Sequence, residues 1–132
     1  MKKIIGMGGA VIKTGAHNLL KENINDIEMF DLAGGSRIIV VDFSTQYIGT
    51  QQINYGQAGT HRFKILDDSG KYYNPQQTYL YCSYSDAFRL GVARSGYKTS
   101  GCLEFIVSDF NEPTKLVFYD DVIYTMCEID LS

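Results

Sequence analysis

The chain lacks long apolar runs and any concentration of basic residues. None of its apolar stretches approaches the ~20 consecutive residues that a membrane-spanning helix requires. Its 12 lysine and arginine residues are scattered over 132 positions, and the formal net charge is −3. Domains that bind DNA or RNA usually carry a basic face. We therefore expect neither a membrane span nor a nucleic-acid partner.

Cysteine is scarce, and its spacing shows no metal-binding pattern. Cys82, Cys102 and Cys127 stand 20 and 25 residues apart, without a CxxC pair or a histidine cluster, which argues against a zinc site. An odd number of cysteines in a protein that is not secreted predicts free, mostly buried thiols. The alternative is a disulfide between Cys82 and Cys102 in an exported protein, because these residues fall on strands that could face each other.

The amino terminus lacks the parts of a complete export signal. Lys2 and Lys3 precede an apolar stretch over residues 4–12, which is the order found in a signal segment. Three glycines weaken that stretch, no small-x-small site follows it cleanly, and no cysteine is present for lipidation. We therefore predict a cytoplasmic location in preference to export.

Sequence motifs of catalysis and cofactor binding are also missing. The glycines of residues 6–9 precede Val11, which stands where a dinucleotide-binding turn needs its third glycine. No G-x-S-x-G sequence is present to position a nucleophilic serine. The acidic pairs Asp67-Asp68 and Asp120-Asp121 stand at expected turns, without the ligand spacing of a calcium loop. We predict a protein that is not an enzyme and that holds no cofactor and no metal ion.

From Arg37 to Ser132 the chain shows short apolar and aromatic runs separated by turn residues. In residues 37–47, Ile39, Val41 and Phe43 fall on one face of an extended strand and Asp42 falls on the other. This alternation is typical of a half-buried strand in a sandwich or barrel. Further strands are expected over residues 61–66, 71–73, 78–84, 88–93, 101–107, 115–119 and 122–129.

Turn chemistry and strand faces refine this pattern. Residues 67–70 (DDSG) favour a tight turn, since aspartate suits early turn positions and glycine supplies positive φ, so residues 61–73 should form a hairpin. Phe105 and Val107 fall on the more apolar face of their strand. We predict that they share one core with Ile39, Val41 and Phe43.

The order of these segments resembles a known family. The chain contains RIIVVDFSTQYIG, then FKILDDSGKYY, a tyrosine-rich segment, SGCLEFIVSD and KLVFYDD. This order resembles the small immunoglobulin-like domains that are common in bacterial lipoproteins and secreted antigens, most of them without an assigned function. The resemblance covers residues 37–121 and implies an immunoglobulin-like β-sandwich. In that family Asp67, Ser69, Gly70 and Gly101 would be turn and strand-start positions rather than catalytic ones.

The chain is therefore predicted to be all-β, with an immunoglobulin-like β-sandwich of seven to nine strands over residues 37–132. Residues 1–36 are expected to form an amino-terminal segment that packs on the sandwich and is irregular or partly helical. Residues 4–5 and 11–12 are candidates for short strands on either side of a glycine-rich bend. Residues 16–23 are expected to form one or two helical turns.

Tyrosine is the residue type that points to a function. Five tyrosines crowd residues 71–84, and alternation along a strand cannot bury them all on one face. Some would line the core or decorate strand faces, whereas outward-facing rings would offer a large contact area with a polar tip, which suits interfaces and sugar-stacking platforms. The residues predicted to bind are Tyr72, Tyr73, Tyr79, Tyr81 and Tyr84.

These observations predict a non-catalytic protein-binding or assembly module, with a protein partner or self-association. The alternative is a carbohydrate- or small-ligand-binding domain that uses the tyrosine-rich surface, with a glycan as its partner. Both predictions rest partly on analogy, because a fold does not by itself determine a function.

Overall fold

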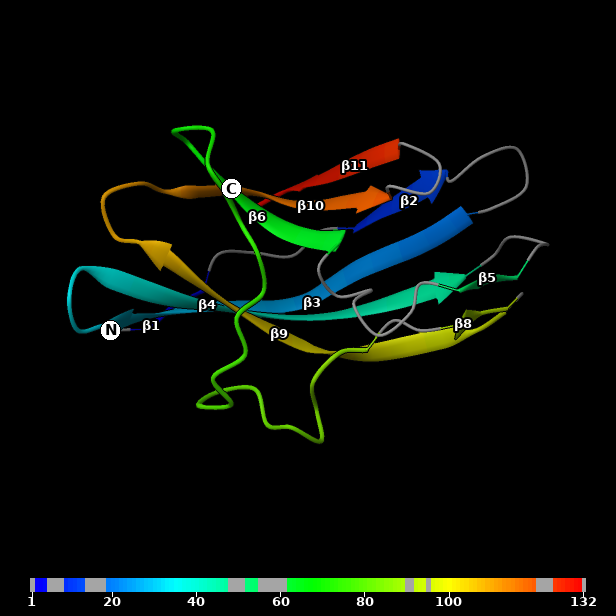
Figure 1. Ribbon diagram of the computed structural model, residues 1–132, viewed down its shortest axis with the longest axis horizontal. Helices are drawn as coiled ribbons and strands as arrows, with labels where there is room; N and C mark the ends of the chain where they lie inside the picture. The colour runs from blue at the N-terminus through cyan, green and yellow to red at the C-terminus, as the bar shows by residue number, and fades with distance from the viewer. Residues whose placement is uncertain are drawn as a thin grey trace.

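The computed structural model describes residues 2–4, 9–13, 19–47, 52–54, 62–89, 92–94, 96–120 and 125–131. None of these residues lies in an α-helix, so none belongs to a helix long and apolar enough to cross a membrane. Figure 1 shows the strands stacked in two main layers. They are β1 (Lys2–Ile4), β2 (Gly9–Lys13), β3 (Leu19–Leu32), β4 (Ser36–Tyr47), β5 (Ile53–Asn54), β6 (Phe63–Asp67), β7 (Tyr72–Tyr73), β8 (Val92–Ala93), β9 (Lys98–Ser108), β10 (Pro113–Asp120) and β11 (Thr125–Asp130).

The first sheet has five strands in the order β1-β3-β4-β9, and β2 also pairs with β3. All of its pairings are antiparallel. The register places Ile39 of β4 opposite Met29 of β3 and opposite Phe105 of β9. One irregularity, between Ile24 and Asp26, interrupts the pairing of β3 with β4.

The second sheet has four strands in the order β11-β10-β6-β7. The predicted hairpin is confirmed, because β6 and β7 pair on either side of residues 68–71. Asp67 Oδ1 accepts hydrogen bonds from the N–H groups of Ser69 (2.9 Å) and Lys71 (3.0 Å), and Gly70 adopts a φ of 88°. The short strands β5 and β8 pair separately.

The hydrophobic core lies between the two sheets. Alternate residues of β3, β4 and β9 face alternate residues of β6 and β10, and the rings of Phe43 and Phe63 meet there with centroids 4.9 Å apart. The prediction of a shared core is confirmed, since all five residues named for it are buried in this cluster. The cluster comprises Ile27, Met29, Ile39, Val41, Phe43, Phe63, Ile65, Phe88, Leu103, Phe105, Val107, Leu116, Phe118 and Leu131.

The prediction of an all-β sandwich is confirmed, and several elements differ from those expected. Residues 19–23 begin β3 instead of forming a helix, because β3 pairs with β4 along its length. The predicted boundary after residue 36 falls where a turn joins β3 to β4 within one sheet. Residues 78–84, predicted to be a strand, belong to no strand. Eight described strands, β4 to β11, fall in the region predicted to hold seven to nine, and β1, β2 and β3 lie in the segment predicted to be irregular or partly helical.

Candidate functional site

Residues 74–86 form an irregular segment, here called the strap, that leaves β7 and runs along the outer edge of β9 (Figure 1). Backbone groups of β9 that point away from β4 are bonded to this segment. The N–H of Gln76 donates to the carbonyl of Glu104 (2.8 Å), and the N–H of Glu104 donates to Oε1 of Gln77 (2.6 Å). The strap therefore takes the place of a further strand at this edge.

A buried carboxylate fixes the centre of the strap. Glu104 is fully buried, and its Oε1 accepts hydrogen bonds from the N–H groups of Thr78 (2.6 Å) and Tyr79 (2.8 Å). Its Oε2 accepts hydrogen bonds from the N–H groups of Tyr81 (3.0 Å) and Cys82 (3.3 Å). Burial alone would raise the pKa of Glu104, but the N–H groups of Tyr81, Thr78 and Tyr79 lower the pKa below its ordinary value. One side chain thus binds the N–H groups of four of the five residues from 78 to 82.

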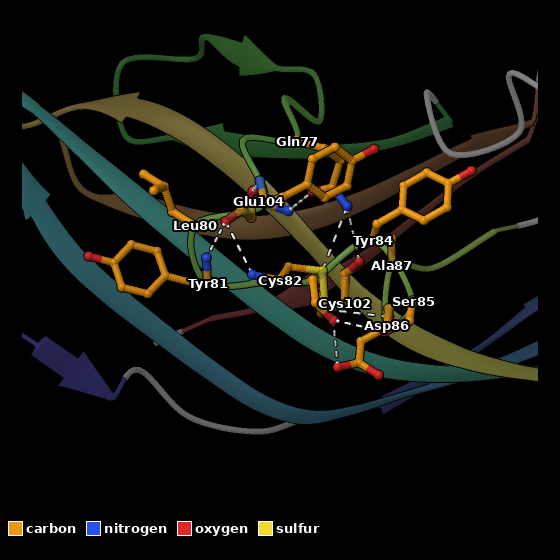
Figure 2. Close-up of a disulfide and its surroundings, with 12 residues drawn as sticks. Gln77, Leu80, Tyr81, Cys82, Tyr84, Ser85, Asp86, Ala87, Cys102 and Glu104 are labelled. Atoms are coloured by element: carbon orange, nitrogen blue, oxygen red, sulfur yellow. Dashed lines mark hydrogen bonds between the residues drawn. A yellow bond between two sulfur atoms is a disulfide. The ribbon is translucent and has the colours of Figure 1, made fainter.

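A disulfide between Cys82 and Cys102 joins the strap covalently to β9, beside the Glu104 bonds (Figure 2). The prediction of three free thiols is therefore wrong, and the alternative pairing of Cys82 with Cys102 is confirmed. Cys82 lies on the strap rather than on a strand, so the two residues meet at a sheet edge. Cys127 lies in β11, and its side chain is outside the described part of the chain.

The end of the strap approaches β9 so closely that only glycine fits. The N–H of Cys102 donates to the carbonyl of Asp86 (3.0 Å), and the N–H of Phe88 donates to the carbonyl of Cys102 (2.9 Å). A Cβ atom at Gly101 would lie 2.6 Å from the carbonyl oxygen of Asp86. The resemblance implied a strand-start role for Gly101, whereas the structure places it inside β9 at this contact.

The strap presents large side chains to solvent. Tyr79, Tyr81 and Tyr84 are 48%, 47% and 68% exposed, and Leu80 between them is 68% exposed. Tyr79 adopts a positive φ of 60°, a strained backbone conformation that its bond to Glu104 holds in place. Figure 2 shows the rings of Tyr81 and Tyr84 directed away from the disulfide on different sides of it.

Contacts between rings and cations hold these side chains in defined positions. Tyr81 stacks on Phe30 of β3, with ring centroids 4.0 Å apart. Tyr84 meets Tyr79 edge to face at 5.7 Å and lies under the guanidinium group of Arg89 at 4.6 Å. These are preorganised aromatic side chains rather than freely rotating ones.

The two other tyrosines predicted to bind lie outside the strap. Tyr72 of β7 is 47% exposed. Tyr73 is half-buried against the core, and its hydroxyl donates to Oδ2 of Asp67 (2.9 Å). The structure thus brings three of the five predicted residues together on the strap and assigns Tyr73 a structural contact.

A groove of about 610 Å³ opens between the strap and the outer face of the first sheet. It lies on the opposite side of that sheet from the core, since its β3 and β4 residues alternate with core residues. Its lining residues are Asp26, Glu28, Val40, Asp42, Tyr81, Ser85, Asp86, Ser100, Gly101 and Cys102.

The groove is acidic. Asp26 of β3 lies directly opposite Asp42 of β4, and Asp86 comes from the end of the strap. Partial burial and the neighbouring charges of Asp26 and Asp86 raise the pKa of Asp42 above its ordinary value. Among the described residues, no group of three or more His, Cys, Asp or Glu side chains is arranged to hold a metal ion.

Of the residues described in the groove, sequence reasoning proposed only Tyr81 for binding, and it identified neither the acidic residues nor Glu104. The three aspartates come from three separate segments, so no local spacing connects them. Glu104 did carry a signal, because it falls between Cys102 and Ile106 on one face of a strongly apolar strand. A lone carboxylate at such a position needs a buried partner, which here is the strap backbone.

Comparison with known proteins shows the fold and no closer relationship. No protein-family model and no curated protein sequence matches the chain. A candidate lipoprotein of Bacillus subtilis, YcdA, shares 14% identity at a TM-score of 0.61, over 91% of this chain but only 38% of that one. The secreted protein MPT63 of Mycobacterium tuberculosis shares 13% identity at a TM-score of 0.59, over 94% of this chain and 92% of that one. A protein of unknown function from Listeria monocytogenes shares 12% identity at a TM-score of 0.55, over 100% of this chain and 88% of that one.

The prediction of a cytoplasmic location is wrong. The cytosol keeps most thiols reduced, whereas Cys82 and Cys102 form a disulfide. A candidate lipoprotein and a secreted protein share the fold. The chain is similar in fold to small β domains of exported proteins.

Proposed function

We propose that this domain is an exported, non-catalytic protein-binding module and that the strap is its recognition surface. The observation that carries the proposal is the combination of exposure and rigidity at residues 79–84. Four large side chains are exposed there, on a backbone held by a disulfide and by a buried carboxylate. Rigid, exposed aromatic groups lose little entropy on binding and are typical of interface anchors.

A protein partner suits this surface better than a stacked sugar. Phe30 covers one face of Tyr81, and Arg89 covers one face of Tyr84. Tyr79 and Tyr84 meet with their planes 62° apart, so together they form a ridge instead of a flat platform. A ridge of this kind fits the pockets of a protein surface. A glycan remains the alternative ligand, because Tyr79, Tyr81 and Tyr84 are 48%, 47% and 68% exposed.

The fold relationship supports an exported setting for this module. We infer that the sandwich is related to the immunoglobulin-like domains that its sequence resembles, in which loops and strand faces commonly bind partners. Because that relationship concerns fold alone, the binding proposal rests on the strap itself.

Selection from a displayed random-peptide library, with a glycan array in parallel, tests the proposal. The strap variant Tyr79→Ser/Tyr84→Ser removes two exposed rings that contact each other instead of the core. The control variant Tyr97→Ser/Phe110→Ser removes two exposed rings elsewhere, 40% and 89% exposed. We expect peptides that bind the wild type and the control but bind the strap variant at least about tenfold more weakly.

Two results would contradict the proposal. Selected peptides that bind the strap variant as well as the wild type would place the interface elsewhere. Enrichment on the glycan array alone, with loss in the strap variant, would favour the carbohydrate alternative. Circular dichroism of each variant checks that the β-sheet content is unchanged.

A further inference from the structure

The groove beside the strap indicates what chemistry the partner carries. Resting on the proposed function, we infer that the bound segment is cationic: an extended stretch of the partner protein packs on the strap and directs lysine or arginine side chains into the groove. Its aliphatic or aromatic side chains contact the ridge of Tyr79 and Tyr84.

Charge complementarity is the first argument. Among the described residues that line the groove, four of ten are carboxylates and none is a lysine or an arginine. Asp26 and Asp42 reach the groove from the paired strands β3 and β4, and Asp86 reaches it from the strap, so the negative charge comes from both the sheet and the strap. Opposite charge on a partner would both steer its approach and fix its register.

The second argument is that two negative charges repel each other in the free domain. Asp26 and Asp42 are directly opposed on neighbouring antiparallel strands, and like charges at such positions destabilise a sheet. The domain would be more stable with a neutral residue at either position. A cationic side chain between them offsets the repulsion in the complex. Binding sites commonly keep residues that lower the stability of the free protein when those residues are needed for binding.

The third argument comes from the groove's other groups and its size. The tyrosine rings of the strap accept cations, since the guanidinium group of Arg89 already lies 4.6 Å from the centre of the Tyr84 ring. Ser85 and Ser100 add hydroxyl groups that can accept hydrogen bonds from an ammonium or guanidinium group. A space of about 610 Å³ has room for several side chains.

The same library selection tests this inference with a second pair of variants. The groove variant carries Asp26→Asn, Asp42→Asn and Asp86→Asn, which changes the formal net charge from −3 to 0. The matched control carries Asp68→Asn, Asp109→Asn and Asp130→Asn, which makes the same change at three exposed positions outside the groove. Binding of individual selected peptides is then measured by fluorescence anisotropy at low and at physiological ionic strength.

We expect peptides selected by the wild type to be enriched in lysine and arginine relative to the starting library. They should bind the groove variant about tenfold more weakly but the matched control within about threefold, and their affinity should fall as ionic strength rises. The groove variant should also unfold at a higher temperature than the wild type, because repulsion has been removed. Lost binding could then not be attributed to lost structure.

The outcomes separate this inference from the proposed function. Peptides that depend on the strap tyrosines but show no cationic bias, or that bind the groove variant as well as the wild type, overturn the inference and leave the proposed function standing. Failure to select any strap-dependent peptide overturns both. Equal losses in the groove variant and the matched control would mean that only net charge matters, which also overturns the inference.

Discussion

The ring of Tyr81 lies flat on the ring of Phe30, with centroids 4.0 Å apart and planes 6° apart. The backbone N–H of Tyr81 is bonded to Glu104 of β9, whereas Phe30 belongs to β3. The side chain of Tyr81 therefore reaches across the intervening strand, β4, and connects the strap to two strands of the sheet. Tyr81 also lines the acidic groove.

We expect Phe30→Ala to loosen the strap without unfolding the sandwich. The loss of one stacked pair and of partly buried apolar area should lower the free energy of unfolding by about 1–2 kcal/mol. A double-mutant cycle with Tyr81→Ala, measured by urea denaturation, should give a coupling energy of about 1 kcal/mol. Additive effects would show that the two rings do not support each other.

Thiol titration under denaturing, non-reducing conditions should find one free thiol per chain. The chain has three cysteines, and Cys82 and Cys102 are bonded to each other. Replacing both with serine should lower the free energy of unfolding by about 3 kcal/mol, the value expected for closing a loop of this length. A count of three free thiols would show that the strap is not covalently attached.

Glu104→Gln should be among the most destabilising single substitutions outside the core. An amide has only one acceptor oxygen, so at least one pair of strap N–H groups would meet an N–H₂ group, at a cost of about 3 kcal/mol or more. The control Glu128→Gln removes an exposed carboxylate paired with Lys115 and should change stability by less than about 1 kcal/mol.

The same variant gives a pH signature. The folded-state pKa of Glu104 lies below its ordinary value of 4.5, so its stabilisation is fully present above pH 4.5 and is lost as pH falls through the lowered pKa. The stability difference between wild type and Glu104→Gln should therefore shrink in that acid range. A difference independent of pH would mean that the carboxylate charge does not contribute.

Asp42→Asn should stabilise the free domain at neutral pH, by about 0.5 kcal/mol, because it removes the repulsion from Asp26. The folded-state pKa of Asp42 is raised above 3.8, so the repulsion is present at higher pH and disappears as pH falls through the raised pKa. The gain in melting temperature should accordingly diminish on acidification. Asp109→Asn, an exposed position outside the groove, should show no such gain.

The sequence allowed the sandwich and its core to be predicted, because β4, β9 and the β6–β7 hairpin follow the alternation and turn rules without interruption. It did not allow β3 to be predicted. In the register of β3 with β4, Ile27 and Met29 are paired with Val41 and Ile39, whereas beyond the irregularity Ile24 is paired with Phe43, so the spacing of apolar residues in the sequence changes phase within the strand. A pattern search that assumes one period does not detect such a strand.

The strap could not be predicted because local alternation and tertiary bonding disagree. TYLYCSY alternates as a strand would, yet its N–H groups are bonded to a distant carboxylate instead of a neighbouring strand. The groove depends on the same tertiary arrangement. Only the exposure of several tyrosines could be anticipated, because alternation along a strand cannot bury all five of them on one face.

The attachment of the strap to β9 has a consequence for solubility. The bonds from Gln76, Gln77 and Asp86 occupy backbone groups of Glu104 and Cys102 at the edge of the first sheet. If the strap were released by reduction, those groups would become available to pair with a strand of another molecule. We therefore expect the reduced domain to aggregate through its β9 edge, so that the bonds that hold the tyrosines in position also keep one copy of the protein from pairing with the next.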